Sequence, residues 1–317
     1  MAIDIDSIPV GRPTSARIYV LKAREARRAV IFRRGPSNAV RLLTWNLKSD
    51  RVTPGQWLKK RVYERRCDLT PDGGLLIYFA ADWRAPYGTF TAVSKPPYFT
   101  ALALWGKGDA WGGGGLFPSE REILLNHRPE PYHAWPEFEL AEGFFLPPKM
   151  TVRPFFEHSG WGEDDPIRAI RLQRDGWRFV QNAAPSDWRG RRHRFAFVHR
   201  RPEIVMKTDR ERSPRYALRI TEPAVGDRRG RWNVELADIV VPRKLGKADV
   251  IRPLGRVDWA DIDDTGDILW AWNGLIHRLK RPSGGVDGFA QAEPRLVADL
   301  NGMTFEAIPT PEKAKRW

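Results

Sequence analysis

The chain has 317 residues, 42% of them hydrophobic, and a formal net charge of +14. This apolar fraction can bury a sizeable core, which excludes a disordered chain, and the single cysteine, Cys67, excludes an intrachain disulfide and a thiolate-rich zinc site. Asp4, Asp6 and Pro9 interrupt any signal peptide, and no stretch approaches the roughly 18 uncharged residues of a membrane span, so we expect a cytoplasmic protein that has no membrane partner.

Glycine and proline interrupt almost every window of helical length, because the chain contains 27 Gly and 26 Pro. Between them lie short runs of β-branched and aromatic residues, each about as long as a strand. Many short strands separated by turns indicate an all-β protein. In chain order, we predict strands over residues 29–32, 40–45, 75–80, 100–105, 167–172, 177–180, 194–198, 216–220, 232–236 and 268–272.

The segment 67–80 carries the clearest hairpin signal. A strand that ends at Leu69 meets the turn Thr70-Pro71-Asp72-Gly73, and a second apolar strand follows. The ring of Pro71 fixes its own φ at about −65°, and Gly73 supplies the positive φ that a tight turn needs. Cys67, beside the first strand, is expected to be a small buried hydrophobic residue.

The same order of strand, Asp/Gly turn and strand occurs three more times. In 257–279, a turn at 263–266 precedes the strand 268–272, and Asn273-Gly274 then joins that strand to 275–279. Weaker copies are expected in 99–117, with a turn at 106–108, and in 167–180, with a turn at 175–176.

With these units the chain resembles the β-propellers of the WD40 and TolB type, in which an S-P-D-G-like turn joins the first two strands of a blade. The resemblance implies a single β-propeller domain over residues 1–317, with about six blades (five to seven) and loop insertions. One insertion is a Pro-rich segment or long loop near 127–165. The G-H…W-D signature of WD40 repeats is absent and the spacing is irregular, which favours a divergent propeller.

Positive charge is concentrated in residues 189–231, which contain fourteen Lys and Arg against five Asp and Glu. Clustered positive charge attracts polyanions, although a solvated arginine-rich face is the simpler alternative. At the start of this segment Trp188 adjoins four arginines, and arginine binds phosphates while tryptophan stacks on bases. These arginines are Arg189, Arg191, Arg192 and Arg194.

The chain contains fourteen tryptophans, which we divide by position. Those in or beside predicted strands are expected to pack between blades: Trp45, Trp57, Trp105, Trp177, Trp232, Trp259 and Trp270. Others lie in Gly-rich, Pro-rich or charged loops, where exposed aromatic side chains favour recognition. These are Trp83, Trp111, Trp135, Trp161 and Trp188.

We find no motif that identifies a catalytic, cofactor or metal site. His127 and His133 share a Pro-rich loop and could meet His158, but their spacing matches no metal-ligand motif. The acidic run 163–165 lacks the EF-hand pattern, and the glycines 112–115 lack the pattern of a phosphate-binding loop. We therefore expect no cofactor and no metal, and we assign no catalytic residue.

Three functions remain open at this point, and the sequence favours the first. It is a non-enzymatic protein-interaction scaffold or recognition subunit of a larger bacterial-type complex. The second is RNA or DNA binding through the basic segment 189–231, and the third is a propeller hydrolase or lyase with its site in the central channel. The candidate binding surface consists of Trp188, Arg189, Arg191, Arg192, Arg194, Trp161, Trp135, Trp111 and Trp83.

Overall fold

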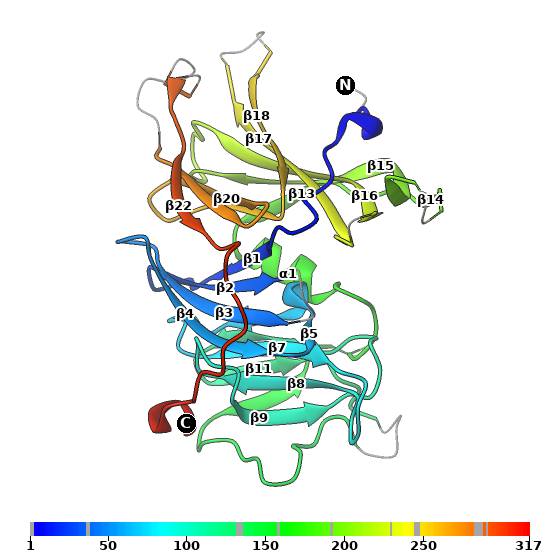
Figure 1. The fold of residues 1–317 in the computed structure, drawn as a ribbon, viewed down its shortest axis with the longest axis vertical. Helices are drawn as coiled ribbons and strands as arrows, with labels where there is room; N and C mark the ends of the chain where they lie inside the picture. The colour runs from blue at the N-terminus through cyan, green and yellow to red at the C-terminus, as the bar shows by residue number, and fades with distance from the viewer. Residues whose placement is uncertain are drawn as a thin grey trace. The chain divides into compact units, whose positions relative to one another are not determined.

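The chain divides into two compact units, each made of two stretches of sequence. Unit 1 contains Met1–Ile18 and Gly176–Met303, and unit 2 contains Tyr19–Asp175 and Thr304–Trp317. No helix in the described part of the chain is long and apolar enough to cross a lipid bilayer. The computed structural model describes residues 3–35, 39–130, 136–156, 159–190, 193–228, 230–243, 248–281, 288–289 and 291–317 (Figure 1).

Unit 2 is built on three sheets. The first has the order β1 (Arg17–Lys22), β2 (Arg28–Arg34), β3 (Val40–Asn46) and β4 (Arg51–Leu58). The second has the order β5 (Arg61–Val62), β7 (Leu76–Ala81), β8 (Thr89–Ser94) and β9 (Ala101–Gly106), and β6 (Asp68–Leu69) pairs with β7. The third joins β10 (Gly115–Ser119), β11 (Glu122–Leu125) and β12 (Thr151–Pro154), in which β11 and β12 are parallel.

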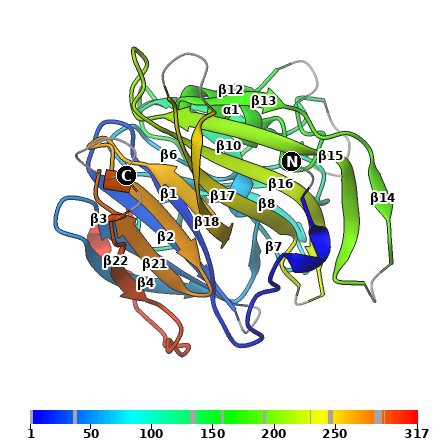
Figure 2. The ribbon, with the colours of Figure 1, turned by 90° about the horizontal axis from the view of Figure 1, so that it is seen from above.

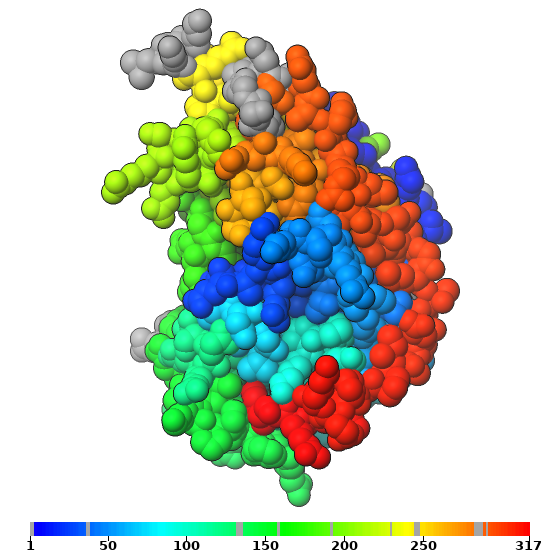
Figure 3. Space-filling view, turned by 90° about the vertical axis from the view of Figure 1, so that its left-hand side faces the viewer, coloured from blue at the N-terminus to red at the C-terminus, as the bar shows by residue number. Residues whose placement is uncertain are grey.

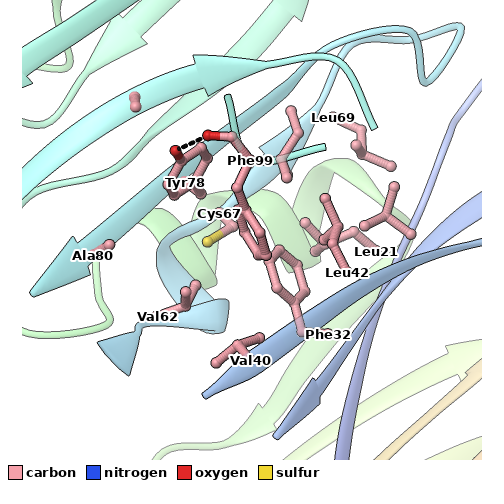
Figure 4. Packing of buried hydrophobic residues seen from close by; sticks show 13 residues of the cluster. Leu21, Phe32, Val40, Leu42, Val62, Cys67, Leu69, Tyr78, Ala80 and Phe99 are labelled. Carbon is pink, nitrogen blue, oxygen red and sulfur yellow. Dashed lines mark hydrogen bonds between the residues drawn. The ribbon is translucent and has the colours of Figure 1, made fainter. Parts of the chain in front are cut away.

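The first and second sheets share a hydrophobic core within unit 2 (Figure 4). Phe32 from β2 and Leu42 from β3 pack with Tyr78 from β7 and with Phe99, and all four are buried. The Tyr78 hydroxyl donates a 2.6 Å hydrogen bond to the Phe99 carbonyl, so its polar atom is satisfied inside the core. Cys67 is buried in the same cluster, and this burial raises the pKa of its thiol. The cysteine is therefore a small buried hydrophobic residue, as the sequence predicts.

Unit 1 contains two antiparallel sheets, one of six strands and one of four (Figure 2). Its six-stranded sheet has the order β13 (Trp177–Gln181), β15 (Phe195–Thr208), β16 (Ala217–Asp227), β17 (Asn233–Val241) and β18 (Val250–Val257), and β14 (Ser186–Trp188) pairs with β15. Its four-stranded sheet has the order β19 (Trp259–Ile262), β20 (Ile268–Trp272), β21 (Leu275–Leu279) and β22 (Arg295–Asp299). Short 3-10 helices elsewhere in the chain cover Ile5–Ser7, Glu64–Arg66 and Glu312–Ala314.

The N-terminal segment, residues 3–16, belongs to unit 1 and packs against β15, β16 and β17 of the six-stranded sheet. Ile8 packs with Phe195 and Val234 in a buried cluster. Its carbonyl accepts a 2.6 Å hydrogen bond from the Arg194 guanidinium, and the Pro9 carbonyl accepts one of 2.6 Å from Arg256. Polar and apolar contacts together therefore hold this strand-free segment in place.

Two predicted hairpins are confirmed, with the expected turn chemistry. β6 pairs with β7 across the turn 70–73, where Gly73 has a φ of +73° and its N–H donates to the Thr70 carbonyl at 2.8 Å. β19 pairs with β20 across 263–266, and β20 pairs with β21 through Asn273-Gly274. The φ values of +52° and +80° at this last pair are those of a type I′ turn.

The predicted strand 167–172, and with it the hairpin 167–180, is wrong because these residues form the helix α1 (Ile167–Arg174). The helix buries Arg168 and Arg171 beside Ile167, while Ile170 is exposed. The Arg171 guanidinium donates to the Cys67 carbonyl inside unit 2. Buried arginines thus take the place of the apolar stripe by which a helix is normally recognised in a sequence.

The predicted hairpin 99–117 is also wrong. β9 pairs with β8 and β10 pairs with β11, so the two segments belong to different sheets. The glycines between them have positive φ, and a Cβ on Gly113 would lie 2.4 Å from the Phe79 ring. They are needed for close packing of this connection rather than for a hairpin turn.

The prediction of an all-β protein is confirmed, since most described residues of regular structure lie in the strands of five sheets. Every other predicted strand overlaps an observed one, whereas β1, β4, β5, β8, β11, β12, β14, β18 and β22 were not predicted. In the segment 127–165 the described residues contain the short strand β12. A single propeller of about six blades stays a prediction.

Candidate binding surfaces

Three aromatic side chains of unit 1 form a row that we call the aromatic platform: Trp188, Phe197 and Trp232. Trp188 on β14 is the register partner of Phe197 on β15, and their ring centroids are 4.7 Å apart. The Phe197 and Trp232 centroids are 6.2 Å apart. Trp188 is 55% exposed and Trp232 is 49% exposed, so two indoles of the platform face solvent.

The backbone explains how Trp232 joins this row. It directly precedes β17, and its carbonyl accepts a 2.6 Å hydrogen bond from the Gly226 N–H at the end of β16. A Cβ on Gly226 would lie 2.9 Å from the Ala196 Cβ and 3.5 Å from the Trp232 ring. Glycine at this position therefore makes room for the indole. The expectation that Trp232 is an interior packing residue is wrong. The other tryptophans of that group are buried, except for the half-buried Trp57: Trp45, Trp105, Trp177, Trp259 and Trp270.

The predicted arginines have different surroundings. Arg189 follows Trp188 and is exposed, with no carboxylate in ion-pair distance among the described residues. Arg194 is half-buried and is used to hold the N-terminal segment at Ile8. Arg228, which sequence reasoning did not single out, is exposed, and its N–H donates to the Arg194 carbonyl at 3.1 Å. Arg191 and Arg192 lie outside the described residues.

Part of the positive charge of 189–231 is internal. Arg231 is buried, donates to Asp258 at 3.0 Å, and lies over the Trp272 ring at 4.9 Å. Arg256 lies over the same ring at 4.9 Å and donates to Asp227 at 2.7 Å. Burial raises the pKa of Asp258 in spite of these cations. The Arg231 guanidinium is therefore not available to a ligand at the surface.

Trp83, on the loop between β7 and β8, is 62% exposed and is the most exposed of the predicted tryptophans that the structure describes. It borders a pocket of about 440 Å³ that we call the basic pocket. The pocket is lined by Lys59, Lys60, Arg61, Asp82, Trp83 and Arg84. Sequence reasoning missed this site, although the run Lys59-Lys60-Arg61 and the pair Trp83-Arg84 are visible in the sequence.

Trp111 and Trp161 are both exposed, and their loops lie side by side. The Gly112 N–H donates a 2.6 Å hydrogen bond to the Gly162 carbonyl. Trp161 stacks on the Arg128 guanidinium, which lies 4.0 Å from its ring centroid. Trp135, the remaining predicted tryptophan, lies outside the described residues.

Beneath Trp161 lies a buried group of charges that has no sequence signal. Lys107 is 2.9 Å from Asp109 and 3.1 Å from Glu137, and Arg128 is 2.9 Å and 2.6 Å from the same two carboxylates. Two cations and two anions thus neutralise each other. Burial lowers the pKa of Lys107. This closed set is suited to holding the surrounding loops rather than to binding an ion.

The histidines considered as metal ligands do not form a described site. His127 is buried and hydrogen-bonded to protein atoms on both ring nitrogens. His133 and His158 lie outside the described residues. In the ranges that the structure describes, no group of three or more His, Cys, Asp or Glu side chains is placed to hold a metal ion.

No protein-family model matches this chain, and no curated protein is significantly similar to it. The candidate surfaces must therefore be judged by their own geometry. Among them the aromatic platform combines two indoles that are about half exposed with Arg189 and Arg228, which have no carboxylate within ion-pair distance in the described ranges.

Proposed function

We propose that this is a binding protein that holds single-stranded nucleic acid on the aromatic platform of unit 1. The observation that carries the proposal is the row Trp188, Phe197 and Trp232, whose outer rings are about half exposed. The exposed Arg189 directly follows Trp188, and the exposed Arg228 directly follows β16. Proteins that bind single strands combine such stacking surfaces with a positively charged path for the backbone.

The chemistry of the platform fits bases and phosphates together. Each base stacked on an aromatic side chain contributes roughly 1–3 kcal/mol, whatever its identity. Exposed guanidinium groups hold phosphates through paired N–H donors and release counterions from the strand. The net charge of +14 adds a long-range attraction for any polyanion.

The scaffold function favoured by the sequence makes a different use of the same residues. Tryptophan and arginine are also enriched in the centres of protein interfaces. Arg189 and Arg228, which have no carboxylate within ion-pair distance in the described part of the chain, favour a polyanion over a protein partner, because an interface with a protein has to bury or pair them. The two functions can be distinguished by whether the protein binds single-stranded nucleic acid and by how strongly that affinity depends on the salt concentration.

The test is the binding of a fluorescein-labelled 20-nucleotide single strand, followed by anisotropy at several NaCl concentrations. Trp188→Ala and Trp232→Ala should each weaken binding about 5- to 100-fold, and Trp111→Ala, an exposed tryptophan of unit 2, should not. The affinity should fall with salt, with a log–log slope of about −0.7 per neutralised phosphate, and Arg189→Ala should make the slope shallower.

Absence of binding, or binding that neither platform variant affects, would overturn the proposal. A stoichiometric protein partner that the wild type captures and Trp188→Ala does not, together with no binding of the strand, is the result expected of a scaffold.

A propeller arrangement is proposed for the sheets as well. The first sheet of unit 2 and the last sheet of unit 1 each have four strands in sequence order, the size and order of a propeller blade, and this supports the proposal. A crystal structure should find the sheets arranged around one axis, and sheets stacked face to face would contradict it.

A further inference from the structure

The basic pocket of unit 2 is formed by two loops that leave the same end of the second sheet. Lys59 and Lys60 precede β5, and Asp82 to Arg84 follow β7. Because Arg61 is the register partner of Ala81, β5 and β7 bring the two loops together. A volume of about 440 Å³ lies in the range of small-molecule sites.

Four cationic side chains line this pocket, against the single carboxylate of Asp82. Asp82 is already paired with Lys60. In the described part of the chain, no carboxylate lies within ion-pair distance of Lys59, Arg61 or Arg84. The pocket therefore holds uncompensated positive charge. Burial, and then the charge of Arg84, lowers the pKa of Lys60, as expected beside an excess of cations.

Two of these cations lie against aromatic rings instead of acids. The Lys59 ammonium is 4.1 Å from the Phe305 ring centroid, and the Arg61 guanidinium is 4.5 Å from that of Tyr63. Cation–π contacts of this kind orient a cation but leave its charge available to an anion. The pocket is consequently arranged for an anionic ligand before any ligand arrives.

Trp83 supplies the aromatic side chain of the pocket. Its backbone has a φ of +60°, which is rare and unfavourable for a bulky residue. The N–H groups of Asp82 and Trp83 both donate to the Gly88 carbonyl, at 3.0 and 2.9 Å, and hold the loop in this shape. The indole stays 62% exposed, so the strained backbone serves to present a flat ring to solvent beside the cations.

We propose that the basic pocket binds a nucleoside phosphate, with the base stacked on Trp83 and the phosphates held by Lys59, Arg61 and Arg84. A simple anion would use the cations and leave the indole without a role. An uncharged aromatic compound would use the indole and leave the cations without one. A nucleoside phosphate has both a planar base and a compact set of negative charges, and arginine forks match its phosphate oxygens.

The test is isothermal titration of the full-length protein with ADP, adenosine and pyrophosphate in parallel. ADP should bind at least tenfold more tightly than either fragment. Trp83→Ala should weaken ADP binding about 5- to 100-fold, Trp83→Phe should restore most of it, and Arg84→Gln should weaken it about tenfold or more. Arg121→Ala, an exposed arginine elsewhere in unit 2, is the matched control and should have no effect.

Failure to bind ADP, or ADP binding that Trp83→Ala leaves unchanged, would overturn this inference. Equal affinities for ADP and pyrophosphate would also overturn it, since the site would then recognise phosphate alone. The inference stands apart from the aromatic platform: Trp188→Ala should bind ADP as the wild type does, and Trp83→Ala should still bind the single strand. Each result therefore bears on one of the two sites.

Discussion

The hydrogen bonds around His127 define its protonation state. The Glu137 carbonyl can only accept, so the His127 Nδ1 that lies 2.7 Å away must carry a proton and donate it. The Nε2 then accepts from the Thr91 hydroxyl at 2.8 Å, and that hydroxyl oxygen in turn accepts from the Gly114 N–H at 2.7 Å. Burial, and then the charge of Lys107, lowers the pKa of His127 to about 3.

This neutral histidine predicts a pH-dependent stability. The unfolded chain binds a proton at His127 near pH 6.5 and the folded protein only near pH 3, so stability should fall by about 1.4 kcal/mol per pH unit as the pH drops below about 6.5. Urea denaturation at pH 7, 6, 5 and 4.5 should show this slope. In His127→Gln it should be shallower, with a remainder from His277, whose pKa burial also lowers. Equal slopes in both proteins would contradict the assignment.

The buried ion pair of Arg256 and Asp227 allows a second prediction. Both side chains are fully buried and 2.7 Å apart. Arg256→Ala removes the buried guanidinium that pairs with the buried Asp227 carboxylate, which should lower the free energy of unfolding by about 3–5 kcal/mol. The matched control is Arg219→Ala, because the Arg219–Asp238 pair has the same 2.7 Å separation but is partly exposed and should cost about 1 kcal/mol or less. Chemical denaturation measures both, and similar losses would refute the distinction.

The turn between β20 and β21 allows a prediction about one element. Gly274 has a φ of +80°, and a Cβ there would lie 2.1 Å from the Asn301 Oδ1. Asn301 cannot move freely, since it donates to the Asn273 carbonyl at 3.0 Å and accepts from the Ala16 N–H at 2.9 Å. Gly274→Ala should therefore destabilise the protein by about 2–3 kcal/mol through backbone strain, a clash and lost hydrogen bonds.

Gly255 in β18 separates these contributions. Its φ is +81°, but a Cβ there would meet nothing within 4 Å. Gly255→Ala should cost only the strain of the left-handed backbone, about 1 kcal/mol. Thermal unfolding should show the larger loss for Gly274→Ala, and equal losses would show that backbone strain, not the contact with Asn301, dominates at the turn.

Elements with local turn chemistry were predictable from the sequence, whereas elements decided by distant contacts were not. The turns at Gly73 and Gly274 need a positive φ whatever the tertiary structure around them. Their hairpins can therefore be predicted from the neighbouring residues alone. The helix α1 depends on buried arginines whose acceptors lie far away in sequence, such as the Cys67 carbonyl for Arg171. Hydrophobic periodicity carries no information about such partners.

The candidate sites, like the elements, were only partly predictable from the sequence. Exposure of Trp188 and Trp83 was predictable because both stand in loops or short strands with polar neighbours. The place of Trp232 beside Phe197 was not, because it depends on how β14, β15 and β17 pair across the sheet. The basic pocket likewise exists only once β5 and β7 bring two loops together.

The chain passes twice through each unit: it begins in unit 1, forms most of unit 2, completes unit 1 and ends in unit 2. The returning segment, 304–317, is tied to unit 2 by specific contacts, and Figure 3 shows it in red on the molecular surface. The Gln56 amide of β4 donates to the Ile308 carbonyl at 2.9 Å, and the Trp317 indole donates to the Phe145 carbonyl at 2.9 Å. The last residues therefore act as part of the unit 2 structure.

Removal of residues 304–317 should accordingly loosen unit 2 and leave unit 1 unchanged. Each lost hydrogen bond contributes about 1 kcal/mol, so several together should lower the stability of unit 2 measurably. Hydrogen exchange followed by mass spectrometry should show faster exchange in β4 and around Phe145, and unchanged exchange in β15 to β17. Gln56→Ala, which removes the bonds to Ile308 and Thr310 and the one from the Phe99 N–H, should speed exchange in β4 and at Phe99. Faster exchange in both units would mean that the segment stabilises the whole chain, because local opening follows the contacts that a segment makes.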